Sequence, residues 1–276
     1  MSTATLDEPA TARPTTVRVE PVTLSRVIKS EWIKFASLRS SWITLLVSML
    51  GMIGVGALAS WATNNHWSQM GPGELAHFQA VTRSLVGVNL AQLAIIVLGV
   101  LVITGEYATG MIIASLGAAP KRTTTLLAKL TVFGVITFCV SLVSSFIAFV
   151  IGQQLLQSHG VGLGAPHAIR AIFGVAIYLT LIGAMSLGVG FAIRSTAGGI
   201  ATVLGIVLVL PALQDILPTS WQPHTTPYLP SNAGSALYSA VPDPGSLSLW
   251  TGFFVLLAWA VAALALGLYL LKRRDA

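Results

Sequence analysis

The sequence predicts an all-α integral membrane protein with six transmembrane helices. Of its 276 residues, 54% are hydrophobic and only 9% are charged, whereas a soluble domain carries about a quarter charged residues. The apolar residues are gathered into long blocks, and a helix needs about 20 of them to span a bilayer. These blocks lack the regular alternation of an outer-membrane barrel, so the spans are expected to be helices.

The first 40 residues contain no spanning block. Residues 1–22 are rich in Thr, Pro, Ala and Val, which predicts a disordered cytoplasmic tail. Residues 23–39 predict an amphipathic helix lying in the membrane interface, because apolar residues recur at helical spacing opposite basic ones. The apolar stripe of this interfacial helix consists of Leu24, Ile28, Trp32 and Phe35. The simpler alternative is that this stretch is only the basic flank of the first span.

Six spans are expected within one transmembrane domain that covers residues 23–276. They run over about residues 42–61, 85–104, 126–151, 171–193, 198–217 and 250–271. The fifth span is interrupted by Pro211. The segment 218–249 after it holds six prolines and a single charge, Asp243. Such a segment predicts short extracellular or re-entrant helices and no further span.

The basic residues predict the orientation of the spans. With six spans both termini share a side, and a cytoplasmic placement leaves only Arg83 and Arg170 of the 15 Lys and Arg residues outside. Cytoplasmic loops carry an excess of Lys and Arg. The N and C termini are therefore expected in the cytoplasm. The net charge of +6 then faces the cytoplasmic leaflet, and no groove for nucleic acid is required.

No catalytic constellation stands out in the sequence. There is no Gly-x-x-x-x-Gly-Lys-Ser/Thr loop that could cradle phosphates, and the histidines lack the HxxxH and HExxH spacings. The single cysteine, Cys139, excludes an intrachain disulfide and a cysteine-rich metal site. We expect no enzyme activity, no metal site and no cofactor in this chain. The five histidines all fall in predicted outer loops: His66, His77, His159, His167 and His224.

Two amides in the second span are candidates for lining a pathway. Asn89 and Gln92 lie three residues apart and so share one side of a helix. Two interpretations stay open: a polar stripe beside a substrate path, or hydrogen bonds between helices that hold the bundle together. No Asp, Glu or Lys is expected at mid-membrane depth, which argues against ion-coupled transport.

The loop between the second and third spans has an unusual pattern. An acid follows the span, a glycine permits a turn, and the apolar segment Met111–Leu116 is too short to cross a bilayer. A short apolar helix on the cytoplasmic face either lies among lipid headgroups or docks in a groove of a partner. The candidate residues of this segment are Glu106, Gly110, Met111, Ile112, Leu116, Lys121 and Arg122.

The stretch Glu106-Tyr-Ala-Thr-Gly-Met resembles the corresponding loop of type-2 ATP-binding-cassette (ABC-2) exporter permeases. The resemblance extends to Leu116, Pro120, Lys121-Arg122 and Lys129, and its specific part covers about residues 104–130. Gly-Met stands where many members have Gly-Thr. The entry Ser30-Glu31-Trp32-Ile33-Lys34, the run Arg39-Ser-Ser-Trp42 and the ending Lys272-Arg-Arg-Asp275 look like those of small six-span bacterial members.

This resemblance implies the permease subunit of an ATP-driven exporter in the bacterial plasma membrane. A homodimer is expected, with a separate cytoplasmic ATPase subunit on each half that binds ATP and Mg. The loop helix would receive the motion of that ATPase. In the family the fifth span lies near the dimer axis, where Ala197, Ala201 and Gly205 form a small-residue stripe. The apolar walls point to an apolar or amphipathic substrate. The alternative function is a non-transporting anchor or immunity-type subunit with the same topology.

Overall fold

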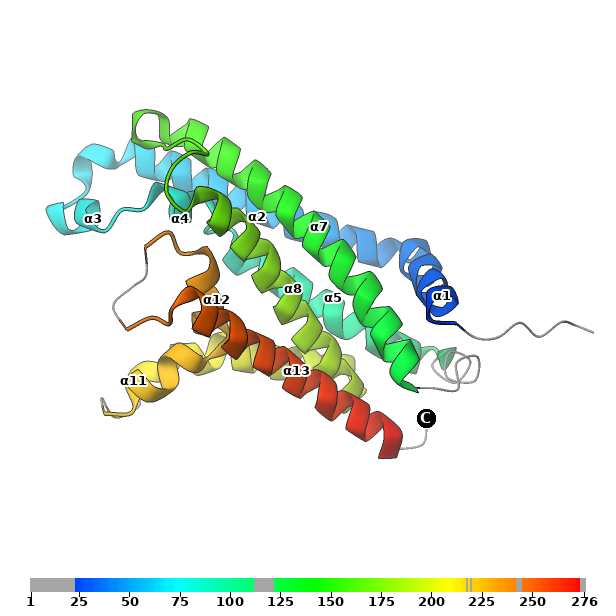
Figure 1. Cartoon of the computed structure of the whole chain (residues 1–276). Helices are drawn as coiled ribbons and strands as arrows, with labels where there is room; N and C mark the ends of the chain where they lie inside the picture. The colour runs from blue at the N-terminus through cyan, green and yellow to red at the C-terminus, as the bar shows by residue number, and fades with distance from the viewer. Residues whose placement is uncertain (1–22, 112–121, 217, 219, 242–244, 274–276) are drawn as a thin grey trace, which may run out of the picture.

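The computed structural model describes residues 23–111, 122–216, 218, 220–241 and 245–273, and within these ranges the chain is helical with no strand (Figure 1). Five helices are long and apolar enough to cross a membrane. They are α2 (Arg39–Asn65), α5 (Val88–Ala108), α7 (Arg122–Leu156), α8 (Ala168–Ile193) and α13 (Leu249–Arg273). The all-α class is confirmed, and the chain is a multi-pass membrane protein by the length and composition of these helices.

The five helices extend beyond the predicted apolar blocks. Helix α2 begins three residues before Trp42, and α7 continues for 35 residues. At a rise of 1.5 Å per residue, α7 is about 52 Å long, well over the ~30 Å of a hydrocarbon core. Helix α7 must therefore tilt, or extend beyond the apolar layer at one or both ends. The apolar blocks thus predicted the existence of these helices better than their ends.

The predicted fifth span, residues 198–217, is not present as a single long helix. The chain there forms α9 (Thr196–Leu204), the π-helical turn η3 (Gly205–Val209) and α10 (Leu210–Ala212), a shorter apolar stretch than the other five. The structure thus has five long helices where six were predicted. Pro211 cannot donate a backbone hydrogen bond, and the π-helical turn before it interrupts the regular ladder, so the helix ends early.

The predicted short helices between the last two apolar segments are present. They are α11 (Gln222–Thr225), η5 (Thr226–Tyr228) and α12 (Pro230–Tyr238), and a further short turn, η4 (Gln214–Ile216), lies at the end of the predicted fifth span. Helix α12 packs closely on its neighbours, because Gly234 lies directly against the ring of Tyr178 in α8 and Gly252 of α13 lies against the backbone of Ala233. A side chain at either glycine would force α12 away from the bundle.

Helix α8 lies at the centre of the bundle (Figure 1). It packs against α5, α7, α12 and α13, and it is the most buried of the five long helices. Glycines permit the closest approaches: Gly99 of α5 faces the backbone of Gly183, and Gly188 faces the backbone at Ala263 and Leu264 of α13. Such contacts between small residues are the usual means of packing helices in a bilayer.

The N-terminal helix α1 (Leu24–Ser37) forms within the predicted residues and ends at Ser37, and α2 begins at Arg39 after the single residue Leu38. It lies against α7 and buries Val27, Glu31 and Phe35. The predicted stripe is therefore divided, since Phe35 faces the bundle while Leu24 and Trp32 remain about half exposed, at 47% and 48%. Ile28 lies between the two sides, partly buried.

Two ends of the bundle can be distinguished in Figure 1. At one end α1 lies near the start of α7 and the end of α13. The other end carries the connections α11 and α12, together with further short helices. These are η1 (Trp67–Gln69), α3 (Pro72–Ala76), α4 (Ala80–Ser84) and η2 (Gln157–His159). We refer to these as the α1 end and the loop end.

Candidate functional site

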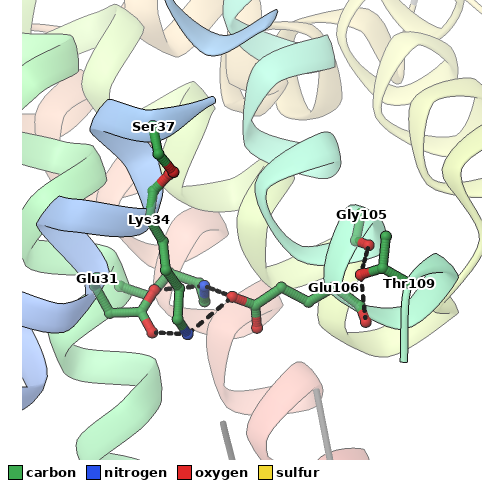
Figure 2. A network of polar contacts seen from close by, with 7 residues as sticks. Glu31, Lys34, Ser37, Gly105, Glu106 and Thr109 are labelled. Carbon is green, nitrogen blue, oxygen red and sulfur yellow. Dashed lines mark hydrogen bonds and ion pairs between the residues drawn. The ribbon is translucent and has the colours of Figure 1, made fainter. Parts of the chain in front are cut away.

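Four charged side chains meet at the α1 end and form what we call the charged junction: Glu31, Lys34, Glu106 and Lys129. Figure 2 shows Glu31 and Lys34 of α1 meeting Glu106 of α5. Lys129 Nζ of α7 donates to Glu31 Oε2 at 2.6 Å and to Glu106 Oε1 at 2.8 Å. Lys34 Nζ donates to Glu31 Oε1 at 2.7 Å and to Glu106 Oε1 at 3.2 Å. Two acids and two bases thus link three helices.

The charged junction is almost wholly buried. Glu31, Lys129 and Glu106 are 4%, 3% and 8% exposed, and the Lys34 side chain is 25% exposed. Charges removed from water are tolerated when each is paired and hydrogen-bonded, whereas an unpaired buried charge costs several kcal/mol. The two acids and two bases balance one another, so the junction has no net charge.

Helical spacing places each member of the junction. Glu31 lies four residues after Val27 and four before Phe35, so it shares their buried side of α1. Lys129 shares a buried side of α7 with Leu126 and Phe133 for the same reason. Glu106 occupies the last turn of α5. Each charge therefore sits on an otherwise apolar side of its helix, directed at the neighbouring helices.

Lys34 lies outside the long apolar helices, and its partners keep it charged. Burial by itself would lower the pKa of Lys34. The hydrogen bond to Glu31, the charge of Glu31 and the contacts with Glu106 outweigh burial and raise the pKa above its ordinary value. Lys34 is therefore protonated throughout the physiological pH range.

The chain leaves the charged junction through a tight turn. Helix α5 ends at Ala108, and the Thr109 hydroxyl donates to the carbonyl of Gly105 at 2.9 Å. Gly110 has a φ of 70°, in the left-handed region that favours glycine. This conformation redirects the backbone straight after α5, as the sequence predicted for a turn there.

The structure describes part of the predicted coupling segment. Met111 follows the turn and is 47% exposed. Arg122 begins α7 and donates a hydrogen bond to the carbonyl of Leu271 in α13. Ile112, Leu116 and Lys121 lie outside the described residues, and so does the predicted short helix. Of the candidate coupling residues, only Glu106 belongs to the charged junction.

The two candidate pathway amides are not part of one polar stripe. Gln92 is buried and accepts a hydrogen bond from the Tyr178 hydroxyl of α8, as expected of an amide that joins helices. Asn89 is exposed, and its amide donates to the carbonyl of Val86 in the turn before α5. Positions three apart on an α-helix differ by about 60° in direction. That angle turns Gln92 towards α8 and Asn89 outwards.

The small-residue stripe of α9 lies on the outer side of that helix. Ala197 and Ala201 are exposed, and a Cβ at Gly205 would meet nothing within 4 Å in the described structure. The opposite side of the helix is buried through Val203 and Val207. The stripe is therefore free to contact lipid or another chain.

Sequence reasoning missed Glu31 and Lys34 as members of a buried cluster with Glu106. A usable signal was present, because Glu31 interrupts the apolar stripe of α1 and Lys129 interrupts an apolar side of α7. An acid and a base placed on two apolar helix sides point to a buried ion pair. Within the described ranges, no group of three or more His, Cys, Asp or Glu residues could hold a metal ion.

A scan against protein-family models and a search of curated proteins found no match to this chain. The class of the protein therefore rests on its own structure, which is that of an all-α multi-pass membrane protein with a buried charged junction at one end.

Proposed function

We propose that this chain is the permease subunit of an ATP-driven exporter of the ABC-2 type, located in a bacterial plasma membrane. The observation that carries the proposal is the charged junction. Its Glu106 lies in the last turn of α5, three residues before Thr109, and the turn at Thr109 and Gly110 leads into the predicted coupling segment. A partner that moves this segment would act directly on a buried ion-pair cluster.

The charged junction would transmit such a movement to three helices together. Lys129 binds Glu31 and Glu106 at once, so α1, α5 and α7 cannot separate without leaving a buried charge unpaired. Separation would cost several kcal/mol. A push on the loop after α5 would therefore shift these three helices as one body against α8 and α13. Relative movement of two helix groups is what an alternating pathway requires.

The proposed assembly places the α1 end in the cytoplasm, with both termini on that side. Each permease subunit would bind one copy of a separate ATPase, which holds ATP and Mg. Two permease subunits would form a homodimer through the outward-facing stripe of Ala197 and Ala201 on α9 and Gly205 at the start of η3. The apolar segment Thr196–Ala212 and the short helices after it would together make up the remaining membrane passage. The cargo would be an apolar or amphipathic molecule.

The first experiment tests docking of the ATPase. In Met111→Asp, a charge replaces an apolar side chain that is half exposed beside the junction. We expect this variant to lose a co-expressed ABC-type ATPase in a pull-down from detergent-solubilised membranes, because a charge in an apolar groove is costly. The matched control is Met70→Asp at the loop end, which should retain the partner. Equal retention by both variants would refute docking through this segment.

A second variant separates docking from coupling. Glu106→Gln keeps the shape of the side chain but leaves Lys34 and Lys129 with one carboxylate fewer. We expect the ATPase to remain bound while ATP hydrolysis no longer responds to substrate in reconstituted vesicles. A normal response would show that the junction only holds the fold. A chain that anchors an ATPase without transport would bind it and show no substrate-stimulated hydrolysis in the wild type.

A further inference from the structure

A cavity lies beside the charged junction. It has a volume of about 390 Å³ and is bounded by α1, α2, α5 and α7. Small-molecule sites in proteins commonly occupy about 300–1,000 Å³. The cavity is therefore large enough for a small amphiphile, and four separate helices contribute to its walls.

The lining of the cavity is divided into two parts. Most of the wall is apolar, and the principal residues are Phe35, Leu38, Leu98, Leu101, Val132 and Phe133. The charged junction lies at the polar part, and the hydroxyl-bearing residues Ser37, Ser40 and Thr44 add further polar groups. Such a lining suits a molecule with an apolar body and one polar head.

One buried acceptor in this lining has no partner. Both lysines of the charged junction bind Glu106 Oε1, while Glu106 Oε2 is buried with no hydrogen-bond partner in the described part of the chain. The residue is 8% exposed. A buried acceptor without a donor is costly. Glu106 is one of the residues that line the cavity, and the terminal torsion of a glutamate is soft, so its carboxylate can rotate towards a donor bound there.

Charge balance restricts the kind of head group that fits. The two acids and two bases of the junction already sum to zero. An ammonium or a carboxylate brought among them would leave one buried charge without a counterpart. A neutral hydroxyl can donate to Glu106 Oε2 without changing the net charge. An uncharged alcohol therefore fits the site better than an amine or an acid.

We propose that the cavity binds a neutral hydroxylated amphiphile of the medium-chain alcohol type. Its O–H donates to Glu106 Oε2, and its hydrocarbon chain lies along Leu101, Leu98 and Val132. The site is built from the described residues of this chain alone. It does not depend on an ATPase or on the proposed transport function.

The experiment uses a diazirine derivative of 1-octanol as a photolabel on the full-length protein in lipid nanodiscs, with mass spectrometry to locate the label. We expect labelling within residues 31–44, 98–109 and 129–133. At equal concentration in the bilayer, 1-octanol should protect these residues about tenfold better than heptyl methyl ether. The ether has the same numbers of carbon and oxygen atoms as the alcohol but no O–H. A tenfold difference in protection corresponds to the free energy of one hydrogen bond to a charged acceptor. Octylamine and octanoate should protect as poorly as the ether.

Leu101→Trp fills the cavity from α5 and should abolish this labelling. The control Leu50→Trp adds the same side chain on the exposed side of α2 and should leave the labelling unchanged. Equal protection by alcohol and ether, equal protection by a charged competitor, or unchanged labelling in Leu101→Trp would each overturn the proposal. The comparison of competitors uses the wild type alone, so it remains decisive even if a variant does not fold.

Discussion

The two ends of the bundle are held together by different kinds of bond. At the α1 end, the charged junction joins three helices through contacts between charged side chains. At the loop end, side chains mainly donate to backbone carbonyls: Arg170 to Ser239 at 2.6 Å and Gln153 to Ala80 at 2.9 Å. Each pair at the loop end joins segments at least 69 residues apart.

This difference determines how each end responds to substitution. Every residue has a backbone carbonyl. A hydrogen bond at the loop end therefore requires a particular donor side chain, but any residue can supply the accepting carbonyl. The charged junction requires a particular side chain at both ends of each bond, because the loss of a buried member leaves an excess buried charge. A change at a deeply buried member such as Lys129 should therefore destabilise the protein more than a change at the loop end, whereas Lys34, whose side chain is 25% exposed, should contribute less.

The largest effect is expected for Lys129→Met. This change leaves Glu31 and Glu106 close together and buried without the lysine that joins them. Breaking a buried pair costs about 3–5 kcal/mol. We expect a loss of that size in the free energy of unfolding, measured by denaturation in mixed micelles. The exposed Lys29 offers a control, since Lys29→Met should change stability little. A small loss for Lys129→Met would mean that the junction contributes little to the fold.

An intermediate effect is expected for Arg170→Met at the loop end. The guanidinium donates to the carbonyls of Ser239 and Ala240. These two residues directly follow α12, so the hydrogen bonds attach the end of α12 to α8. A hydrogen bond from a charged group contributes about 1.5–3 kcal/mol, and the same unfolding measurement should show a loss in that range. Ser239→Ala keeps the accepting carbonyl and should cost about 0.5 kcal/mol or less. If Ser239→Ala cost as much as Arg170→Met, the loop end would depend on side chains at both partners.

The smallest effect is expected for Lys34→Met. This lysine is 25% exposed, so solvent weakens its ion pairs to about 1 kcal/mol or less. Folding raises the pKa of Lys34. The stability that Lys34 contributes is therefore fully present below its pKa in the unfolded chain, about 10.4, and is lost only as the pH rises through its pKa in the folded protein. The stability difference from wild type should thus be constant between about pH 6 and pH 9, by the same linkage. A difference that fell within this range would contradict a raised pKa.

Long apolar blocks made most of the fold predictable from the sequence. A run of about 20 apolar residues has few alternatives to a spanning helix, and five of the six blocks became such helices. The fifth block did not form one long helix, because the π-helical turn at Gly205–Val209 interrupts it. Pro211 marked a weak point, but the sequence does not show whether such a helix kinks and continues or ends.

The charged junction was only partly predictable. Glu106 and Lys129 each stood out within the loop motif, but as separate positions. Their pairing depends on how α5 and α7 pack, and the bond between Lys129 and Glu31 joins residues 98 positions apart. Periodicity within one helix identifies a buried side, but it carries no information about which helix will lie against it.

The short apolar stretch formed by α9, η3 and α10 also bears on the lipid around this protein. Its 17 residues, Thr196–Ala212, amount to about 25 Å of helix, some 5 Å less than a typical hydrocarbon core. If this stretch forms part of the remaining membrane passage, as proposed, the lipid beside it thins or the helix draws its flanking residues inwards, and either response has a cost that grows with acyl-chain length. Bilayers of shorter acyl chains would relieve this hydrophobic mismatch. The 35-residue α7 has the opposite mismatch, because it is longer than the hydrocarbon core is thick and accommodates the excess by tilting or by extending beyond the core.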